Sequence, residues 1–555
     1  MKIGRLHSRL AGVWGYKPTG RKDAFLMIMN NVRIYDPSHP YDDQTYAVKI
    51  NGKTFEKISE EPLEGGEVID GKGKVLAPSF NDSHMHLLRY SLLKKELDLT
   101  EAKSWKEMKQ MVEDHYDKIE QNDWIYGKGF NDGNFDDLDG LLTAEDLNEI
   151  HVDANMYFMH QDGHECVISQ KALERLKEEE AFKQEPDEFK ETDESGEWNG
   201  RFKDTAVHYI KHHFWGRSAA DAKEALKTGI PYLSRYGITS VHTDDINFIG
   251  SYQRLWEAYT QLEQEGELPI DVHLHHYIFN IDDLKNYCLH NELRTGGGTE
   301  RVRVGSVKIF LDGTQRLFTA AMRNPYPVQP DKDGILIYTQ DQLNEMVRYA
   351  SEQKMQVAMH AIGDRAVEQA LTALEQPEAE TERFRHRIIH AQTLAPDLIQ
   401  RMREAAPYIE TQPSFLLDEW DKKQNWSPES LVPFADAYES LLKEQIPITL
   451  SSDLPIGALD PFVTIFSAVN RTGLDGRPEG GWMPQEKISL EAAYTGFTKT
   501  PAELEYNEDH KGIIKGGYQA DFVLLDQHPE EIKPEHLHEL SVLETWHRGQ
   551  RVYKR

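Results

Sequence analysis

A strand–helix–strand unit in the middle of the chain decides the fold. Its two apolar segments are VGSVKIFLD at 304–312 and MQVAMHAIG at 355–363, and an amphipathic helix is predicted between them at 340–354. A strand, a helix and a second strand in this order are typical of a parallel sheet. We therefore expect a parallel sheet at the centre of the protein.

The same alternation extends in both directions along the chain. A second amphipathic helix is predicted at 396–404. The number of repeats favours the α/β class and, within it, a TIM (β/α)8 barrel. The further strands of the series read ITSVHTDD (238–245), DVHLHHYIF (271–279), HRIIHAQ (386–392), YIETQP (408–413) and PITLSSD (447–453).

Short β segments at the two ends of the chain predict a second folding unit. Residues 24–36 are predicted to form a strand and 46–58 its hairpin partner. The C-terminal segment has the same pattern of short β segments separated by glycines. We expect a small β-sandwich domain formed by 24–75 together with 485–555, and a barrel over 76–484.

The barrel series is interrupted by an insertion between about 100 and 220. It contains the strongly acidic run EEEAFKQEPDEFKETDESGEWNG (178–200), for which we predict a solvated loop or short helices within an inserted lobe. Residues 1–23 carry a basic arm but no apolar stretch of signal-peptide length, and they are predicted to be a loose N-terminal extension.

Composition narrows the range of partners. The 555-residue chain has 63 Lys+Arg against 94 Asp+Glu, a formal net charge of −31, so no positive field would attract nucleic acid or an anionic membrane. Cys166 and Cys288 are its only cysteines, which suits a reducing compartment. No apolar run reaches the roughly 18–20 residues that cross a bilayer. We therefore expect a cytoplasmic protein that acts on a small molecule.

The placement of two neighbouring histidines indicates metal chemistry. His84 and His86 follow the apolar run VLAPSF and Asp82, and side chains two positions apart on a strand project to the same side. Two imidazoles in this arrangement can share one divalent cation. The alternative is a surface loop that happens to contain two histidines.

Three further candidates close predicted barrel strands. His360 ends MQVAMH, His390 ends RIIH and Asp453 ends ITLSSD. Barrel active sites lie at the carboxyl ends of the strands, although a histidine there is also common as a hydrogen-bonded residue of the barrel mouth. A carboxylate buried at Asp453 would be costly unless it were paired or bound to metal.

Lys308 is the least expected residue of the predicted barrel. It lies between Val307 and Ile309, where an unpaired ammonium would be expensive to bury. One explanation is a salt bridge, for example with Asp312. The other is that CO2 adds to the neutral amine and gives a carbamate, an anionic oxygen ligand that bridges two metal ions.

Together these residues and their flanking motifs resemble a known family. The sequence is similar to the amidohydrolase superfamily, and within it to the amidohydrolase-3 (YtcJ-like) branch of metal-dependent hydrolases. The matching stretches occur in the family's order over nearly all of 24–555: LAPSFNDSHMHL (76–87), HQDGHECVISQKAL (160–173), VKIFLDGTQRLFTAAM (307–322), AMHAIGDRAVEQAL (358–371), HRIIHAQ (386–392), SSDLPI (451–456) and KGIIKGGYQADFVLLD (511–526).

The resemblance implies roles for these residues. It implies one or two divalent ions, with Zn²⁺ favoured, although imidazole and oxygen ligands also suit manganese or iron. His164 is similar to a histidine of this branch that we place in the substrate pocket, with a packing role as the alternative. The implied metal ligands are His84 and His86 on the first strand, Lys308, usually carbamylated, on the fourth, His360 and His390 on the fifth and sixth, and Asp453, which also shuttles the proton, on the eighth.

Two departures from the family pattern bear on the substrate. After Asp312 the branch commonly has an arginine where this chain has Phe318, and Arg316 is the nearest candidate to replace it. We assign Asp312 and Arg316 to substrate binding and expect a different or less charged substrate. Ser79 and Asn81 also replace a glycine and a branched aliphatic residue, a change that should leave the histidines in place.

The resulting hypothesis is a hydrolase that cleaves a non-peptide C–N bond, of amide or formamide type, with metal-activated water. Asp453 would act as general base and then as general acid. One alternative is a deaminase of an amidine-type substrate, against which Lys308 counts because such deaminases typically lack the bridging lysine. Another is a non-catalytic regulatory binding protein. A homodimer is expected for barrels of this kind.

Overall fold

The fold was examined in a computed structural model. It describes residues 26–555 apart from 40, 117–123, 162–164, 181, 185–186, 204–205, 208–209 and 211–217. The predicted N-terminal extension 1–23 lies outside the described residues.

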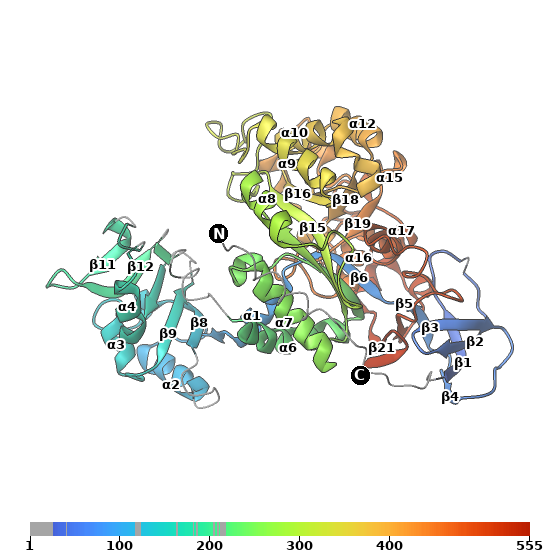
Figure 1. The fold of residues 1–555 in the computed structure, drawn as a ribbon, viewed down its shortest axis with the longest axis horizontal. Coiled ribbons are helices and arrows are strands. Elements are labelled where there is room, and N and C mark those ends of the chain that lie inside the picture. Colours follow the sequence, from blue (N-terminus) through green and yellow to red (C-terminus); the bar gives the residue numbers. More distant parts are fainter. Residues whose placement is uncertain are drawn as a thin grey trace, which may run out of the picture.

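The central sheet is an eight-stranded parallel barrel, as predicted (Figure 1). It is nearly closed. Its first and last strands lie side by side, and Ser83 Oγ on the first donates to Thr449 Oγ1 on the last at 2.8 Å. Its strands, in sheet order from one edge to the other, are β19 (Ile448–Leu450), β18 (Tyr408–Thr411), β17 (Arg387–His390), β16 (Val357–Ala361), β15 (Val302–Phe310), β14 (Asp271–Tyr277), β13 (Ile238–Thr243) and β6 (Phe80–Met85).

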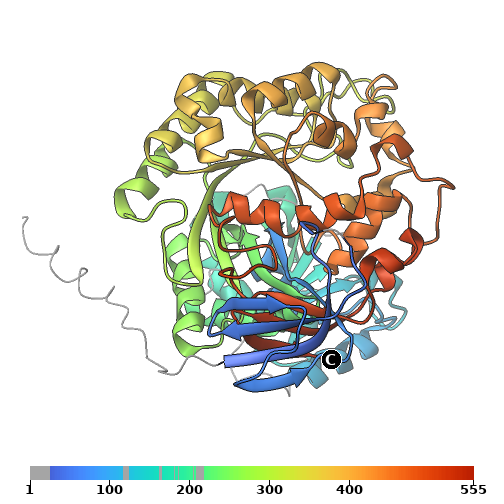
Figure 2. The same ribbon diagram turned by 90° about the vertical axis from the view of Figure 1, so that its right-hand side faces the viewer.

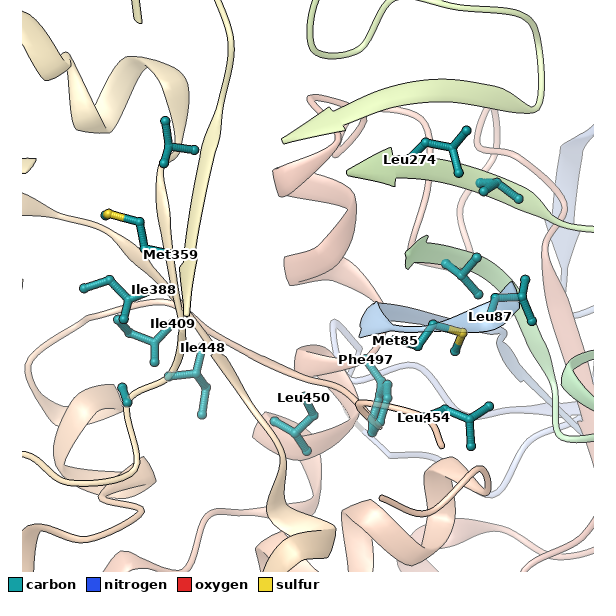
Figure 3. Close-up of a cluster of buried hydrophobic side chains, with 14 of the residues drawn as sticks. Met85, Leu87, Leu274, Met359, Ile388, Ile409, Ile448, Leu450, Leu454 and Phe497 are labelled. Atoms are coloured by element: carbon teal, nitrogen blue, oxygen red, sulfur yellow. The ribbon is translucent and has the colours of Figure 1, made fainter. Parts of the chain in front are cut away.

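Helices cover the outside of the barrel and bury its outward-facing side chains. Met359, Ile388, Ile409 and Ile448 occupy matching positions on four neighbouring strands and are all buried (Figure 3). Among the described residues no helix is both long and apolar enough to span a membrane. The helices that follow the strands include α6 (Ala219–Arg235), α7 (Tyr252–Glu265), α8 (Ile281–His290), α9 (Gln340–Glu352), α10 (Asp364–Leu374), α12 (Pro396–Ala405), α15 (Tyr438–Lys443), α16 (Pro461–Asn470), α17 (Leu490–Gly496) and α18 (Lys499–Leu504).

Strands from both ends of the chain form a second sheet beside the barrel (Figure 2). Its core includes Met29, Val48, Phe522 and Trp546, so the two ends bury one common apolar cluster. This confirms the predicted fold class. The strands are β1 (Leu26–Ile34), β2 (Tyr46–Asn51), β3 (Thr54–Ser59), β4 (Glu67–Asp70), β5 (Val75–Pro78), β20 (Phe522–Leu525), β21 (Val542–His547) and β22 (Gln550–Lys554).

The insertion forms a lobe that leaves the barrel after α1 (Leu87–Lys95) and projects from its side (Figure 1). The lobe has its own six-stranded sheet and two buried apolar clusters. Its elements are β7 (Leu97–Asp98), α2 (Trp105–Tyr116), β8 (Trp124–Phe130), α3 (Ala144–Asn148), β9 (Asn155–His160), β10 (Glu165–Ile168), α4 (Gln170–Lys177), β11 (Lys190–Thr192) and β12 (Trp198–Lys203).

The acidic run 178–200 differs from the prediction of a loop or short helices. Short 3-10 turns are present, but β11 pairs antiparallel with β12 within the run and its continuation. The ring of Phe182 packs edge-on against Trp198 and Phe202, at centroid distances of 5.4 Å in both cases. Sparse aromatic residues therefore anchor a hairpin even though most of the run is charged.

A buried histidine beneath the barrel makes stability depend on pH. Burial lowers the pKa of His386 from 6.5 to about 4. Between pH 6.5 and about 4, His386 is protonated in the unfolded chain but stays neutral in the folded chain. The free energy of unfolding is therefore at its full value above pH 6.5 and decreases as the pH falls to about 4. At pH 5 the loss amounts to about 2 kcal/mol.

We expect His386→Gln to weaken this pH dependence. The melting temperature of the wild type should fall more between pH 7 and pH 5 than that of the variant, measured by calorimetry. Replacing the exposed His290 with glutamine is the matched control and should leave the wild-type difference unchanged. An equal pH response in His386→Gln and the wild type would contradict the assignment.

Candidate metal centre

The first two predicted ligands meet the eighth strand's aspartate at the carboxyl end of the barrel. His84 Nε2 lies 3.5 Å and His86 Nε2 lies 3.3 Å from Asp453 Oδ1. The Nδ1 atom of His86 lies 2.5 Å from the backbone oxygen of Asp244, so it carries the proton and leaves Nε2 available as a ligand. These residues form one group whose ligand atoms all lie within 4.8 Å of one another.

His360 and His390 complete the histidine cluster. Their ring centroids lie 4.6 Å apart, and that of His390 lies 5.8 Å from that of His84. His360 Nδ1 lies 3.0 Å from Asp312 Oδ1, and His390 Nδ1 lies 2.7 Å from Gln412 Oε1. Because each acceptor holds the proton on Nδ1, Nε2 of both rings is left free as a ligand atom. Histidine rings from three strands thus lie next to one another at the carboxyl end of the barrel.

The backbone at two of these positions adopts an unusual conformation. His390 has φ = 77° and Asp453 has φ = 50°, both in the left-handed region that non-glycine residues seldom occupy. The Asp453 amide donates to the oxygen of His84 at 2.8 Å, which ties the eighth strand to the first. Strain of this kind concentrates at functional sites, where the surrounding structure holds it in place.

Electrostatics favour the ligand-competent forms of these side chains. Burial holds the pKa of His84 and of His390 well below 6.5, so both imidazoles are neutral. Burial tends to raise the pKa of Asp453, but the contact with His86 and nearby positive groups hold it below its usual 3.8. Burial tends to lower the pKa of His86, but the contact with Asp453 and nearby acids raise it. The centre therefore combines the neutral imidazoles of His84 and His390 with the ionised carboxylate of Asp453. Imidazole nitrogens and carboxylate oxygens are donors that suit a divalent cation.

Lys308 lies inside the same centre and forms no salt bridge with the described residues. Its side chain is fully buried, and its Nζ has no hydrogen-bond partner among the described residues. Burial lowers the pKa of Lys308 below 10.5. The suggested partner Asp312 is engaged elsewhere, because it accepts from His360 and from the amides of Ile362 and Gly363. The structure thus rules out the suggested salt bridge between Lys308 and Asp312.

Asp244 is a member of the centre that the sequence did not single out. It follows β13 and is 2% exposed, and neither carboxylate oxygen has a hydrogen-bond partner in the described part of the chain. Burial raises the pKa of Asp244, while Lys308 and His86 act against that rise. In the sequence, Asp244 could have been found from the pair of acids that ends ITSVHTDD, because they come directly after a buried strand. This strand end comes near Lys308 only in the folded sheet, where β14 alone separates β13 from β15.

The predicted substrate-binding residues are placed differently from one another. Asp312 is buried and holds His360, so we propose that it positions this ligand and does not contact substrate. Arg316 is exposed and makes no hydrogen bond or ion pair with the described residues. His164 lies outside the described residues.

The interaction between Asp312 and His360 can be tested by substitution. Asp312→Asn keeps the shape but removes the charge that orients the ring, and we expect the affinity for metal or the turnover number to fall about 10- to 100-fold. Metal titration of the apoprotein measures the first and steady-state kinetics the second. Asp333→Asn removes an exposed acid of the same loop and should have no effect. Wild-type values for Asp312→Asn would exclude a positioning role.

A second histidine–acid group lies deeper in the barrel but is already neutralised. His242, His273 and Glu505 come within ligand distance of one another. Lys511 Nζ donates to Glu505 Oε2 at 3.0 Å, and Arg387 donates to His242 Nδ1 at 3.0 Å. Because cations occupy these acceptors, the group is a satisfied ion network and not a second metal site.

The barrel and its centre define a class of protein. Buried imidazoles and a carboxylate converge at the carboxyl ends of the strands, and Asp453 Oδ1, His84 Nδ1 and Lys308 Nζ lack hydrogen-bond partners among the described residues. Such a set is costly unless a cation binds it, so the residues fit a divalent metal ion. The class is that of metal-dependent barrel hydrolases.

Comparison with known proteins gives the family. The sequence model of the amidohydrolase family matches residues 67–553, and the chain therefore belongs to this family and is a hydrolase of carbon–nitrogen bonds. The Bacillus subtilis protein YtcJ, named as an amidohydrolase, is 29% identical over 88% of this chain and 91% of its own.

A solved structure and a second relative extend the comparison. An uncharacterized metal-dependent hydrolase from Pyrococcus furiosus has a TM-score of 0.74 and 26% identity, covering 91% of this chain and 99% of that one. The N-substituted formamide deformylase of Arthrobacter pascens is 24% identical over 96% of this chain and 98% of its own. The predicted family is confirmed.

Proposed function

We propose that the protein hydrolyses the amide or formamide bond of a small molecule and uses one or two divalent metal ions, with Zn²⁺ favoured. The observation that carries this proposal is the convergence of His84, His86, His360, His390 and Asp453 around the buried amine of Lys308. The similarity to an N-substituted formamide deformylase supports a formamide-type substrate.

The proposed ligand set divides into two parts. His84, His86 and Asp453 would hold one ion, and His360 and His390 would hold the other. A carbamate on Lys308 would bridge them: the neutral Nζ attacks CO2, a C–N bond forms and one proton is released to solvent. Two observations support this modification: the buried Nζ has no hydrogen-bond partner among the described residues, and the pKa of Lys308 is lowered.

The side chains would then carry the proton through the reaction. A bound divalent ion lowers the pKa of water from 15.7 toward about 7 and polarises a carbonyl oxygen. Asp453 accepts the proton of the attacking water on Oδ1 and delivers it to the departing nitrogen. Asp244, with both oxygens unpartnered among the described residues, lies beside Lys308 and is available to orient water or the leaving amine.

Metal removal tests this function. We expect dialysis against a chelator to abolish release of free amine from a panel of N-substituted formamides and small amides, and Zn²⁺ to restore it. Release of ammonia from amidines without amine release would favour the deaminase alternative. Purified protein that neither contains nor binds metal would contradict the proposal and favour a regulatory binding protein. The cytoplasmic location and the homodimer stay predictions.

A further inference from the structure

A continuous row of aromatic rings runs from the metal centre to the surface. The ring of Phe310 stacks on His360 with a centroid distance of 4.8 Å and an interplanar angle of 30°. Tyr277 lies 5.1 Å from Phe310, and Phe279 lies 4.5 Å from Tyr277. We call Tyr277, Phe279 and Phe310 the aromatic wall.

Strand register shows that the inner part of this wall faces the interior of the barrel mouth. Side chains alternate along a strand, so Tyr277 shares its side of β14 with the interior residues His273 and His275. Phe310 shares its side of β15 with Lys308, whose Nζ lies 4.8 Å from the centre of the ring. Both rings therefore line the mouth above the metal centre.

The outer part of the wall is an exposed apolar lip. Phe279 is 59% exposed, and Ile337 on the neighbouring loop is 51% exposed. The loops are joined, because Tyr338 donates its hydroxyl hydrogen to the oxygen of Phe279 at 2.9 Å. Aromatic and apolar side chains line ligand sites, and Phe279 continues the row of rings that begins at His360.

The charged groups that act on Tyr277 of the aromatic wall are the carboxylates of Asp244 and Asp283. Tyr277 lies close enough to Asp244 for that carboxylate to contribute to the raised pKa of Tyr277, after burial, which is the larger cause. The Tyr277 hydroxyl has no hydrogen-bond partner among the described residues, so it can donate to a ligand. An uncharged ring fits this surface better than a carboxylate does.

We propose that the aromatic wall binds an uncharged aromatic substituent of the substrate and thereby places the scissile C–N bond at the metal centre. This inference rests on the proposed function and names the substrate class: amides or formamides whose nitrogen or acyl group carries a neutral aromatic ring. Tyr277 and Phe279 are specificity-determining residues, and the metal ligands act on every member of the class.

A pair of substrates tests the wall. N-(2-phenylethyl)formamide and N-methylformamide share the scissile bond and differ in the ring. In Phe279→Ala we expect KM for the phenylethyl compound to rise about tenfold, the size of one lost aromatic contact, with KM for the methyl compound unchanged. Phe279→Tyr should restore the low KM. Leu289→Ala, which removes an exposed apolar side chain of α8 outside the mouth, is the matched control.

Two readouts separate this inference from the proposed function. An unchanged ratio of the two KM values in Phe279→Ala would overturn the inference while leaving the hydrolase intact. A change of oligomeric state with an unchanged ratio would also overturn it and identify the lip as a contact between copies. If neither formamide is hydrolysed, the proposed function fails. The inference about the aromatic wall can then be tested by titration calorimetry with the phenylethyl compound. An equal Kd for wild type and Phe279→Ala would overturn the inference, and a higher Kd for the variant would support it.

Discussion

Asp453→Asn is expected to lower kcat by about 10²- to 10⁴-fold, which is the range for loss of a general acid–base group. Asparagine preserves the size of the side chain but cannot accept the proton of the attacking water. It also weakens the contacts with His84 and His86, which lie 3.5 and 3.3 Å from Asp453 Oδ1. Amine release under saturating substrate measures the effect.

A control variant and metal analysis make this result specific. Asp475→Asn removes an exposed carboxylate that pairs with Arg477, and it should retain wild-type kcat. If Asp453→Asn still binds metal, the loss of kcat reports proton transfer; if it does not, the loss reports ligation. Full activity in Asp453→Asn would contradict both roles.

Lys308→Met is expected to lower kcat about 10²-fold or more without lowering the melting temperature of the apoprotein. Methionine fills a similar volume but cannot add CO2, so the bridging oxygen ligand is lost. Replacing a buried amine that has no partner among the described residues with an apolar side chain does not weaken the barrel. Kinetics and a thermal scan measure the two parts of the prediction.

Reconstitution with CO2 identifies the carbamate itself. Apoprotein given Zn²⁺ in CO2-free buffer should regain less activity than apoprotein given Zn²⁺ and bicarbonate. Lys308→Met should show no response to bicarbonate, because it lacks the amine that reacts. Equal recovery of the wild type with and without bicarbonate would contradict carbamylation.

The histidines that we propose as metal ligands could be chosen from the sequence because the patterns that indicate them are local. His360 and His390 close short apolar strands, and strand ends in a barrel converge whatever the loops do. His84 and His86 are two positions apart, and the structure directs both to Asp453. The barrel itself followed from the alternation of strands and helices.

The residues that support and extend the centre could not be predicted from the sequence, because their roles depend on contacts between segments that are far apart in the chain. Gln412 contacts His390 across 22 positions, and Asp244, which follows β13, acts on Lys308 of β15 across the intervening strand β14. Tyr277 is a candidate for substrate binding because it lies on the same side of β14 as the interior histidines, which only the register of the strand shows. The hairpin of 178–200 depends on aromatic contacts with Phe202, beyond the end of the run.

Anomalous X-ray scattering from crystals of the metal-replete protein tests the central claim most directly. Data collected on both sides of the zinc absorption edge would locate the ion and identify it. The account predicts one or two anomalous peaks enclosed by His84, His86, His360, His390 and Asp453, with carbamate density on Lys308 between two peaks. Metal-replete crystals with no peak among these residues would contradict it.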